Sequence, residues 1–330
     1  MTRLDRALGA LYGLAIGDAL GMPTQAMTSA EIAADYGTID RFVDAGPRQV
    51  IAAGMKAATI TDDTEQAVML GELLVAGEGD VDPTEFAHAL LAWERSMQAK
   101  GSLDLLGPST KRAVERILDG VPQDEAGRFG STNGAAMRIA PVGIARGPEP
   151  VELFMSSVVE ACVVTHNTSL GMSSAAAVGM AVSVGVEVGS VEEVVDAAID
   201  AAVLGDRCGH RVAGGKVQAR IPWAIELLAA TRRDEWPRVI EEVIGTSVAS
   251  QESVVAAFAI LASVLDPWES MCLAAAVGGD TDTIAAIVVA VLGSVVGAAA
   301  LPTRAVDQVV RTNGLDFEPL ARGLLRIRGS

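Results

Sequence analysis

The chain has 330 residues, half of them hydrophobic, and a formal net charge of −17 at pH 7. A field of that sign repels phosphate backbones and anionic lipid, which argues against a nucleic-acid-binding or membrane-surface protein. Most of the acids are predicted to be solvated surface. Aromatic residues make up only 4% of the chain, whereas Ala, Val, Leu and Met abound, and this favours close-packed helices over a β-sandwich.

Helical patterns recur along the whole chain, and no alternating strand pattern of convincing length interrupts them. At residues 82–85, Asp-Pro-Thr-Glu combines a cap, a first-turn proline and a capping-box glutamate before an apolar helix over 85–98. Ser190 and Glu193 repeat the capping box before a helix that ends near Gly205. We predict a compact, all-α single domain spanning 1–330. Further helices are predicted at 3–20, 64–77, 109–119, 150–164, 169–187, 216–231, 252–264, 283–299 and 316–328.

Residues 284–301 run without a charge and are long enough for a membrane helix. Gly293 and Gly297 also have the small-xxx-small spacing of some membrane helices. Because this segment follows an acidic cluster directly and consists mostly of Ala and Val, we predict a buried central helix instead.

Three cysteines occur singly and in an odd number, so a disulfide framework is not expected. The N-terminal residues carry charges before a helical pattern and lack the apolar core of a signal peptide. A reducing, cytoplasmic location is therefore predicted.

Two acidic clusters, Thr-Asp-Asp-Thr-Glu at 61–65 and Gly-Gly-Asp-Thr-Asp-Thr at 278–283, lie about 220 residues apart beside apolar helix patterns. Burying such carboxylates costs several kcal/mol each unless a positive charge compensates. Mg²⁺, Ca²⁺ and Mn²⁺ prefer oxygen ligands, so a hard cation is expected and zinc is not. Asp and Thr also cap helices, so each cluster can equally mark a helix start, and both interpretations can hold together. The shared composition predicts a two-ion site formed where the clusters meet.

Five segments, in this order, resemble the ADP-ribosylglycohydrolase family, which includes the dinitrogenase reductase-activating glycohydrolase. The resemblance covers roughly residues 10 to 300, and the order of all five is more specific than any one segment. The segments are Gly-Leu-Ala-Ile-Gly-Asp-Ala-Leu-Gly-Met-Pro at 13–23, Thr-Asp-Asp-Thr-Glu-Gln at 61–66, Gly-Ser-Thr-Asn-Gly-Ala-Ala-Met-Arg at 130–138, Thr-His at 165–166 and Gly-Gly-Asp-Thr-Asp-Thr at 278–283.

The resemblance implies an orthogonal all-α fold with a binuclear Mg²⁺ or Mn²⁺ centre in a central cleft. Family members hydrolyse the bond between an ADP-ribosyl anomeric carbon and an amino-acid side chain or another ribose. Asp282 is the implied bridging carboxylate. The implied metal ligands are Thr61, Asp62, Asp63, Asp280, Asp282 and Thr283.

The resemblance also assigns substrate contacts. Ser131, Asn133 and Gly134 match a glycine-rich loop that contacts ribose and phosphate, although the loop also reads as a turn before a helix near Ala135. His166 matches the Thr-His dipeptide at the ligand pocket, with a structural hydrogen-bond donor as the alternative.

Three further residues complete the expected site. Asp18, in the first segment, is expected to contact the substrate. Asp104 resembles the Asp of an Asp-x-Gly segment that borders the active site, with one extra residue before the glycine. Arg138 is predicted to be a structural ion-pair partner.

Gln25 marks a departure, because relatives often carry a glutamate two residues after the proline. A glutamine amide can bind a metal or a water but cannot accept a proton as a base. Either Asp62 or Asp63 then serves as the base, or the substrate class has shifted. The catalytic candidates are Asp62, Asp63 and Asp104.

The leading prediction is a Mg²⁺- or Mn²⁺-dependent hydrolase of the anomeric ribosyl bond in ADP-ribosyl compounds, acting on a small molecule or an ADP-ribosylated protein. An N-glycosidase of a smaller nucleoside or ribosyl metabolite is the alternative, supported by the low number of rings available for stacking on adenine, six Phe and two Tyr. A non-catalytic ADP-ribose-binding or structural protein is a third, disfavoured by intact ligand sets in both clusters.

Overall fold

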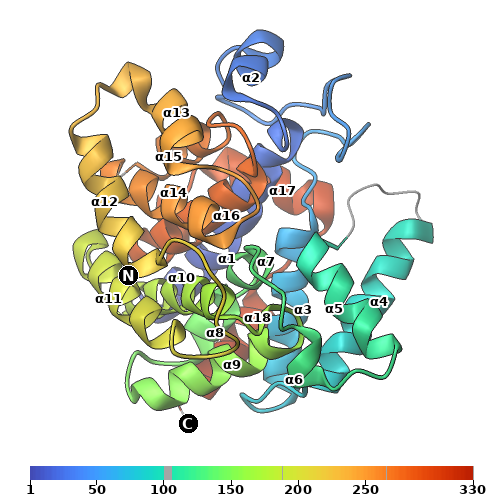
Figure 1. Ribbon diagram of the computed structural model, residues 1–330. Helices are drawn as coiled ribbons and strands as arrows, with labels where there is room; N and C mark the ends of the chain where they lie inside the picture. The colour runs from blue at the N-terminus through green and yellow to red at the C-terminus, as the bar shows by residue number, and fades with distance from the viewer. Residues whose placement is uncertain (100–105, 188, 265, 330) are drawn as a thin grey trace.

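A computed structural model describes residues 1–99, 106–187, 189–264 and 266–329, and within these ranges the protein consists of helices and loops with no β-strand (Figure 1). The predicted all-α fold is confirmed. The α-helices are α1 (Arg3–Gly21), α2 (Ser29–Tyr36), α3 (Asp62–Ala76), α4 (Pro83–Ala99), α5 (Pro108–Leu118), α6 (Gln123–Ala126), α7 (Gly134–Met137), α8 (Ala140–Ala145), α9 (Val151–His166), α10 (Ser169–Glu187), α11 (Val191–Gly205), α12 (Val217–Ala229), α13 (Trp236–Val239), α14 (Ser250–Ser263), α15 (Pro267–Ala274), α16 (Thr281–Val296), α17 (Thr303–Asn313) and α18 (Glu318–Arg328).

Two helix starts that were predicted from capping signals are confirmed. Asp82 accepts hydrogen bonds from the backbone N–H groups of Thr84 at 2.7 Å and Glu85 at 3.1 Å, where α4 begins. Both halves of the Ser190 capping box are present at α11. The sequence pattern does not predict α2, α15, α17 or the four- to six-residue helices α6, α8 and α13, whereas the helix expected near Ala135 is present as α7. These short helices span too few residues for an apolar repeat to show.

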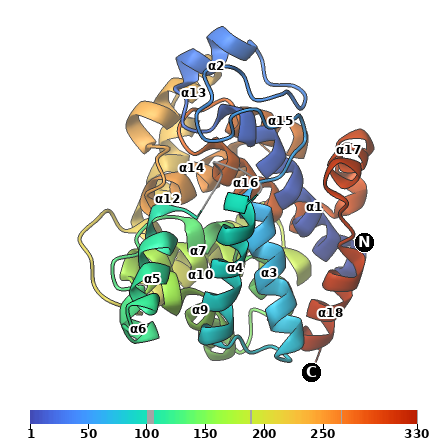
Figure 2. The ribbon, with the colours of Figure 1, turned by 90° about the vertical axis from the view of Figure 1, so that its right-hand side faces the viewer.

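Glycines bring α1 into direct backbone contact with α16 (Figure 2). Four of them recur at every fourth position of α1, from Gly9 to Gly21. A Cβ added at Gly13 would lie 2.3 Å from the carbonyl oxygen of Val289, and one added at Gly21 would lie 2.4 Å from that of Thr281. Because partner numbers fall as those of α1 rise, the helices are antiparallel. The end of α1 therefore lies beside the start of α16.

The predicted buried central helix is confirmed for α16, whose residues 281–294 are all buried. Within the described residues one helix, α10, is long and apolar enough to cross a membrane, and 94% of its apolar window is buried inside the protein. We therefore assign α10 to the core. The three cysteines are free, as their spacing predicted.

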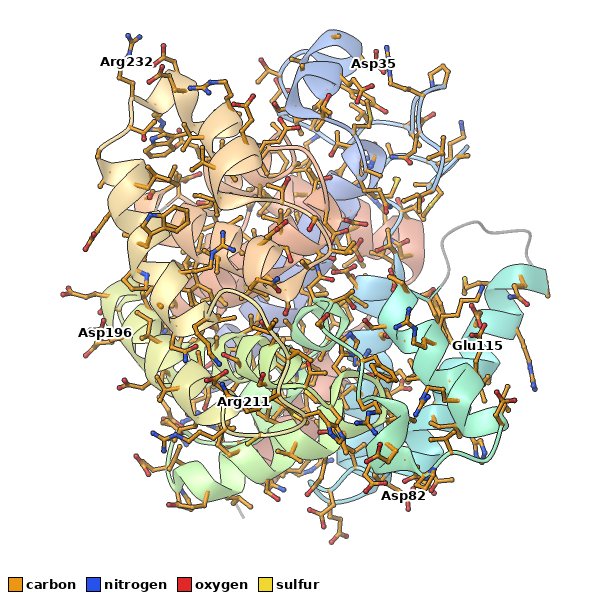
Figure 3. The ribbon with its side chains drawn as sticks, viewed as in Figure 1. Asp35, Asp82, Glu115, Asp196, Arg211 and Arg232 are labelled. Carbon is orange, nitrogen blue, oxygen red and sulfur yellow. The ribbon has the colours of Figure 1, made fainter. Side chains whose placement is uncertain are left out.

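The two ends of the chain lie on one side of the molecule (Figure 2). Glu187, at the end of α10, accepts hydrogen bonds from Arg3 Nε at 3.0 Å and from Arg328 Nε at 2.8 Å. Charged side chains spread over the surface in Figure 3, and those labelled there are all exposed. They are Asp35, Asp82, Glu115, Asp196, Arg211 and Arg232.

Candidate active site

A cavity of about 290 Å³ lies where α3, α5, α7 and α16 begin. Both acidic clusters contribute to its wall, and Thr283 Oγ1 donates a hydrogen bond to Asp63 Oδ2 at 3.2 Å across 220 positions of sequence. The structure thus brings the two clusters together. The lining residues are Gln25, Ile51, Asp62, Asp63, Leu106, Gly107, Pro108, Thr110, Thr132, Asn133, Gly134, Met137, Val248, Asp280, Asp282 and Thr283.

The first cluster forms the start of α3. Thr61 is the N-cap, and its hydroxyl accepts a hydrogen bond from the Asp63 N–H at 3.4 Å. Asp62 Oδ2 accepts from Gln66 Nε2 at 2.7 Å, one turn along the helix. Asp63 is 1% exposed, and its Oδ1 has no hydrogen-bond partner among the described residues. Burial raises the pKa of Asp63 well above its usual value, and neighbouring carboxylates, Asp282 foremost, raise it further.

The second cluster forms the start of α16. Gly278 and Gly279 have φ values of +82° and +73°, which favour glycine, and a Cβ on Gly279 would lie 2.2 Å from the Thr246 carbonyl oxygen. This turn directs Asp280 and Asp282 into the cavity wall. Burial raises the pKa of Asp280, although hydrogen bonds from Asn133 and Thr283 act in the opposite direction. The Thr283 N–H donates to Asp282 Oδ1 at 3.0 Å.

Asp18 does not line the cavity within the described residues, and its substrate contact stays a prediction. It is fully buried, and its carboxylate accepts from the Thr61 hydroxyl at 2.8 Å and from the backbone N–H groups of Thr61 and Thr64 at 3.0 and 3.2 Å. Burial raises the pKa of Asp18 to about 6, with the threonine hydrogen bonds acting in the opposite direction. Asp18 therefore fixes the first turn of α3 and, with it, the placement of Asp62 and Asp63.

The glycine-rich loop reaches the cavity through Asn133 and Gly134, but not through Ser131. The Ser131 carbonyl accepts a hydrogen bond from the Ser250 N–H at 3.1 Å, so Ser131 anchors the loop to the start of α14, and its substrate contact stays a prediction. Asn133 Nδ2 donates to Asp280 Oδ2 and, at 2.9 Å, to Ser253 Oγ.

Gln25 lines the cavity from the loop after α1. It is 5% exposed, and its Nε2 has no hydrogen-bond partner. Its backbone carbonyl accepts from Gln49 Nε2 at 2.8 Å, which holds the loop in place. The site therefore presents a buried amide donor for which the described part of the chain offers no acceptor.

His166 lies behind the glycine-rich loop and is fully buried. Its Nε2 is 3.0 Å from Thr132 Oγ1, and its Nδ1 is 2.8 Å from Thr165 Oγ1. Burial lowers the pKa of His166 well below its usual value, and the charge of Arg138 lowers it further, so the ring is neutral at neutral pH. Within the described residues Thr132 lines the cavity and His166 does not, so the contact between His166 and the cavity wall is made by the Thr132 hydroxyl.

Arg138 is fully buried, and within the described residues it forms no ion pair, which corrects its predicted role. It donates to two neutral oxygens, Gln66 Oε1 at 3.0 Å and Thr165 Oγ1 at 2.5 Å, and lies 4.9 Å from the centre of the Phe86 ring. Burial lowers the pKa of Arg138 to about 10, which leaves it charged at neutral pH.

Sequence reasoning missed Thr110, Thr132 and the apolar wall. The signal available for Thr110 was the segment ending there, which the resemblance placed at the border of the active site; Asp104, in the same segment, lies outside the described residues. No tryptophan lines the cavity within the described chain. The apolar wall consists of Ile51, Leu106, Pro108, Met137 and Val248.

The donor set of the cavity is made of oxygen atoms, which suits Mg²⁺ or Mn²⁺. Asp63 Oδ1 is a buried carboxylate oxygen to which no described residue donates a hydrogen bond. A bound cation would offset the cost of burying it. Across the part of the chain that the structure describes, however, no three His, Cys, Asp or Glu side chains are arranged as they would be around a single ion. The carboxylates line the cavity without closing a coordination shell.

A solved structure described as an "ADP-ribosylglycohydrolase-related protein complex" shares this all-α fold, with a TM-score of 0.69, 26% sequence identity and coverage of 98% of both chains. The model of the ADP-ribosylglycohydrolase family matches residues 1–330, and the chain belongs to that family of glycosyl hydrolases.

Two relatives show how the similarity is distributed. The Escherichia coli (strain K12) protein YegU, described as uncharacterized, is 32% identical over 328 residues, which cover 99% of this chain and 98% of that protein. The ADP-ribosyl-[dinitrogen reductase] glycohydrolase of Rhodospirillum rubrum is 32% identical over 176 residues, which cover 53% of this chain and 56% of that protein.

Proposed function

We propose that this protein hydrolyses the bond between the anomeric carbon of an ADP-ribosyl group and its acceptor, using two Mg²⁺ or Mn²⁺ ions. The proposed ligands are Thr61, Asp62, Asp63, Asp280, Asp282 and Thr283, with Asp282 between the ions. The observation that supports this most strongly is the meeting of both acidic clusters in one cavity, where Asp63 Oδ1 is buried without a donor. Gathering two buried carboxylates, Asp63 and Asp282, with the half-buried Asp62 and Asp280 is costly without cations.

When bound, the ions would orient the vicinal ribose hydroxyls and a water molecule. The carboxylates of the cavity stabilise the positive charge that develops at the anomeric carbon as the bond breaks. The unpaired amide of Gln25 binds an acceptor oxygen of the substrate or of water, because it can donate but cannot take a proton. Proton acceptance then falls to Asp62 or Asp63.

A second candidate is the hydrolysis of a smaller nucleoside or ribosyl metabolite. The apolar wall of the cavity is aliphatic, and no aromatic ring lines it within the described residues. A base in this cavity would therefore pack against aliphatic side chains instead of stacking on a ring.

Calorimetric titration with MgCl₂ and MnCl₂, with and without ADP-ribose, tests the metal centre. We expect two ions per chain. Asp282→Asn should weaken both sites, whereas Asp62→Asn should weaken mainly one, because a bridging carboxylate contributes its charge to each cation. The exposed Asp196→Asn is the matched control. Unchanged stoichiometry and affinity in the Asp282 variant would contradict the shared centre.

Hydrolysis assays test the substrate. ADP-ribosyl-arginine, ADP-ribosyl-serine, poly-ADP-ribose and simple nucleosides are each incubated with the protein, and release of ADP-ribose or free base is followed by chromatography. Release of ADP-ribose that stops with a chelator is the expected result. Turnover of nucleosides alone would replace the first proposal with the second.

A further inference from the structure

A continuous chain of hydrogen bonds leaves the cavity at one point and returns to it at another. It starts at Asp62, which accepts from Gln66 at 2.7 Å, and Gln66 in turn accepts from Arg138 at 3.0 Å. The other side of the same guanidinium donates to Thr165 Oγ1 at 2.5 Å. Thr165 and Thr132 are then joined through the two ring nitrogens of His166, at 2.8 and 3.0 Å.

Arg138 sets the direction of every hydrogen bond on the Asp62 side. A guanidinium has only donors, so Gln66 must present its oxygen to Arg138. The amide NH₂ of Gln66 then faces the carboxylate of Asp62, as the 2.7 Å contact from Nε2 records. Arg138 thus fixes one Asp62 oxygen as a hydrogen-bond acceptor and holds its orientation.

The same reasoning fixes the proton on the other side. Thr165 Oγ1 accepts from Arg138, and within the described residues Nδ1 of His166 is the other contact of this hydroxyl, so we infer that Thr165 donates its proton there. A neutral imidazole that accepts at Nδ1 carries its proton on Nε2. Nε2–H donates to Thr132 Oγ1, which leaves the Thr132 proton available to a ligand in the cavity.

We propose that Arg138 is a positioning residue for the reaction: through Gln66 it orients Asp62, and through Thr165 and His166 it makes Thr132 a hydrogen-bond donor to an acceptor oxygen of the ribosyl or diphosphate part of the substrate. This inference rests on the proposed function. It assigns a substrate contact to Thr132, and it gives the buried histidine a role in setting hydrogen-bond direction.

Stability alone does not account for a charged residue at this place. Arg138 is fully buried, and its Nε has no hydrogen-bond partner. An apolar side chain of similar volume avoids the cost of burying that charge. The guanidinium is also the side chain that can donate in two fixed directions without ever accepting.

The first test reads the tautomer of His166 by long-range ¹H–¹⁵N NMR, with the signal assigned from His166→Gln and with His88 and His210 as internal references. Wild-type His166 should be neutral at pH 7 with its proton on Nε2. Thr165→Val removes the donor to Nδ1, so the Nδ1–H form should appear. A wild-type ring protonated on Nδ1, or a tautomer unchanged in Thr165→Val, would overturn the proposal.

The second test is kinetic. Thr165→Val and Thr132→Val should each lower kcat/KM about tenfold, and the double variant should fall no further than Thr132→Val, because both remove one contact. Thr132→Ser should recover most of the loss. Multiplicative losses, about a hundredfold in the double variant, would show that Thr165 does not act through Thr132.

Ser173→Ala is the matched control, since Ser173 is 1% exposed and its hydroxyl bonds only the Ala202 carbonyl, at 2.9 Å. It should leave both the tautomer and kcat/KM unchanged; an equal loss there would mean that any lost buried hydroxyl has this effect. Should the wild type hydrolyse no ADP-ribosyl compound, the proposed function fails, while the tautomer measurement still decides on the hydrogen-bond chain.

Discussion

The two ends of α16 differ in how their backbone groups and nearby charges are paired. At its C-terminal end, Arg6 Nη1 donates to the carbonyl oxygens of Ser294 at 3.2 Å and Val295 at 2.5 Å, so a cation meets the negative end of the helix dipole. At its N-terminal end, carboxylates of both acidic clusters gather near the positive end of the dipole, and Asp63 Oδ1 has no hydrogen-bond donor among the described residues.

Backbone packing along α16 holds its N-terminal end in place, and hydrogen-bond pairing of the carboxylates there does not. The glycine face of α1 lies against α16 along its whole length, with carbonyl oxygens 2.2 to 2.4 Å from where each Cβ would be. The comparison teaches that the α1–α16 contact contributes to the stability of this protein, whereas the buried carboxylates at its end reduce it.

Gly13→Ala should produce the largest change. Alanine normally favours a helix over glycine, but here the added methyl would lie 2.3 Å from the Val289 carbonyl oxygen, so we expect a loss of about 3 kcal/mol. Denaturant titration measures it. Gly329→Ala is the control, because its nearest atom would be 3.7 Å away. A stabilised Gly13 variant would show that α1 and α16 are not in backbone contact.

Metal removal should come next in size. Ions that bind only the folded protein stabilise it by about 2.7 kcal/mol at a hundred times their dissociation constant. Thermal unfolding in a chelator and then in excess Mg²⁺ or Mn²⁺ should show that difference, and Gly13→Ala should lower both curves equally because the two sites are distant. Identical curves with and without metal would contradict a cation site at this end of α16.

Asp63→Asn should raise the free energy of unfolding in the absence of metal, whereas Gly13→Ala should lower it. In a chelator, the amide removes a buried charge and supplies a donor at the position of the unpaired oxygen, so a gain of about 1 kcal/mol is expected. In Mg²⁺ the gain should disappear together with the metal stabilisation. Thermal unfolding under both conditions checks this, and destabilisation in the chelator would refute it.

Glu187→Gln, near the opposite end of α16, should have the smallest effect. Burial by itself raises the pKa of Glu187, but hydrogen bonds from Arg328 and Arg3 outweigh it and hold the pKa below its usual value. A lowered pKa contributes stability above the unfolded value, and that contribution is lost as the pH falls through the folded value. Urea unfolding at pH 7 should therefore show a loss of about 1 kcal/mol that vanishes at strongly acidic pH. An equal loss at both pH values would rule out the ion pairs.

The sequence predicts contacts between residues that are close together in the chain, but not hydrogen bonds between residues that are far apart in it. Asp82 and Ser190 mark helix starts because their partners are three residues away at most. The acidic clusters stand out because charge beside apolar helix patterns is unusual. Gln66 and Arg138 are hydrogen-bond partners that lie 72 positions apart, and no local pattern predicts their contact.

Asp18 is a residue whose motif was recognised but whose long-range hydrogen bonds were not predicted. Its partners are Thr61 and Thr64, 43 and 46 positions further along. Thr132 was missed although its neighbours were selected, since a threonine in a glycine-rich loop has no distinguishing pattern. Which side of the loop faces the cavity is decided by Ser131 and the start of α14.

The pairing of α1 with α16 also determines when this protein can complete its fold during synthesis. Thr281 Oγ1 donates to the Gly21 carbonyl oxygen at 3.0 Å across 260 positions, so the first helix leaves the ribosome long before its partner is made. Closing so long a loop is slow and exposes apolar surface meanwhile. A nascent chain therefore holds an uncovered glycine face and only the first acidic cluster until α16 has been made, and the cavity between the two clusters cannot form before then.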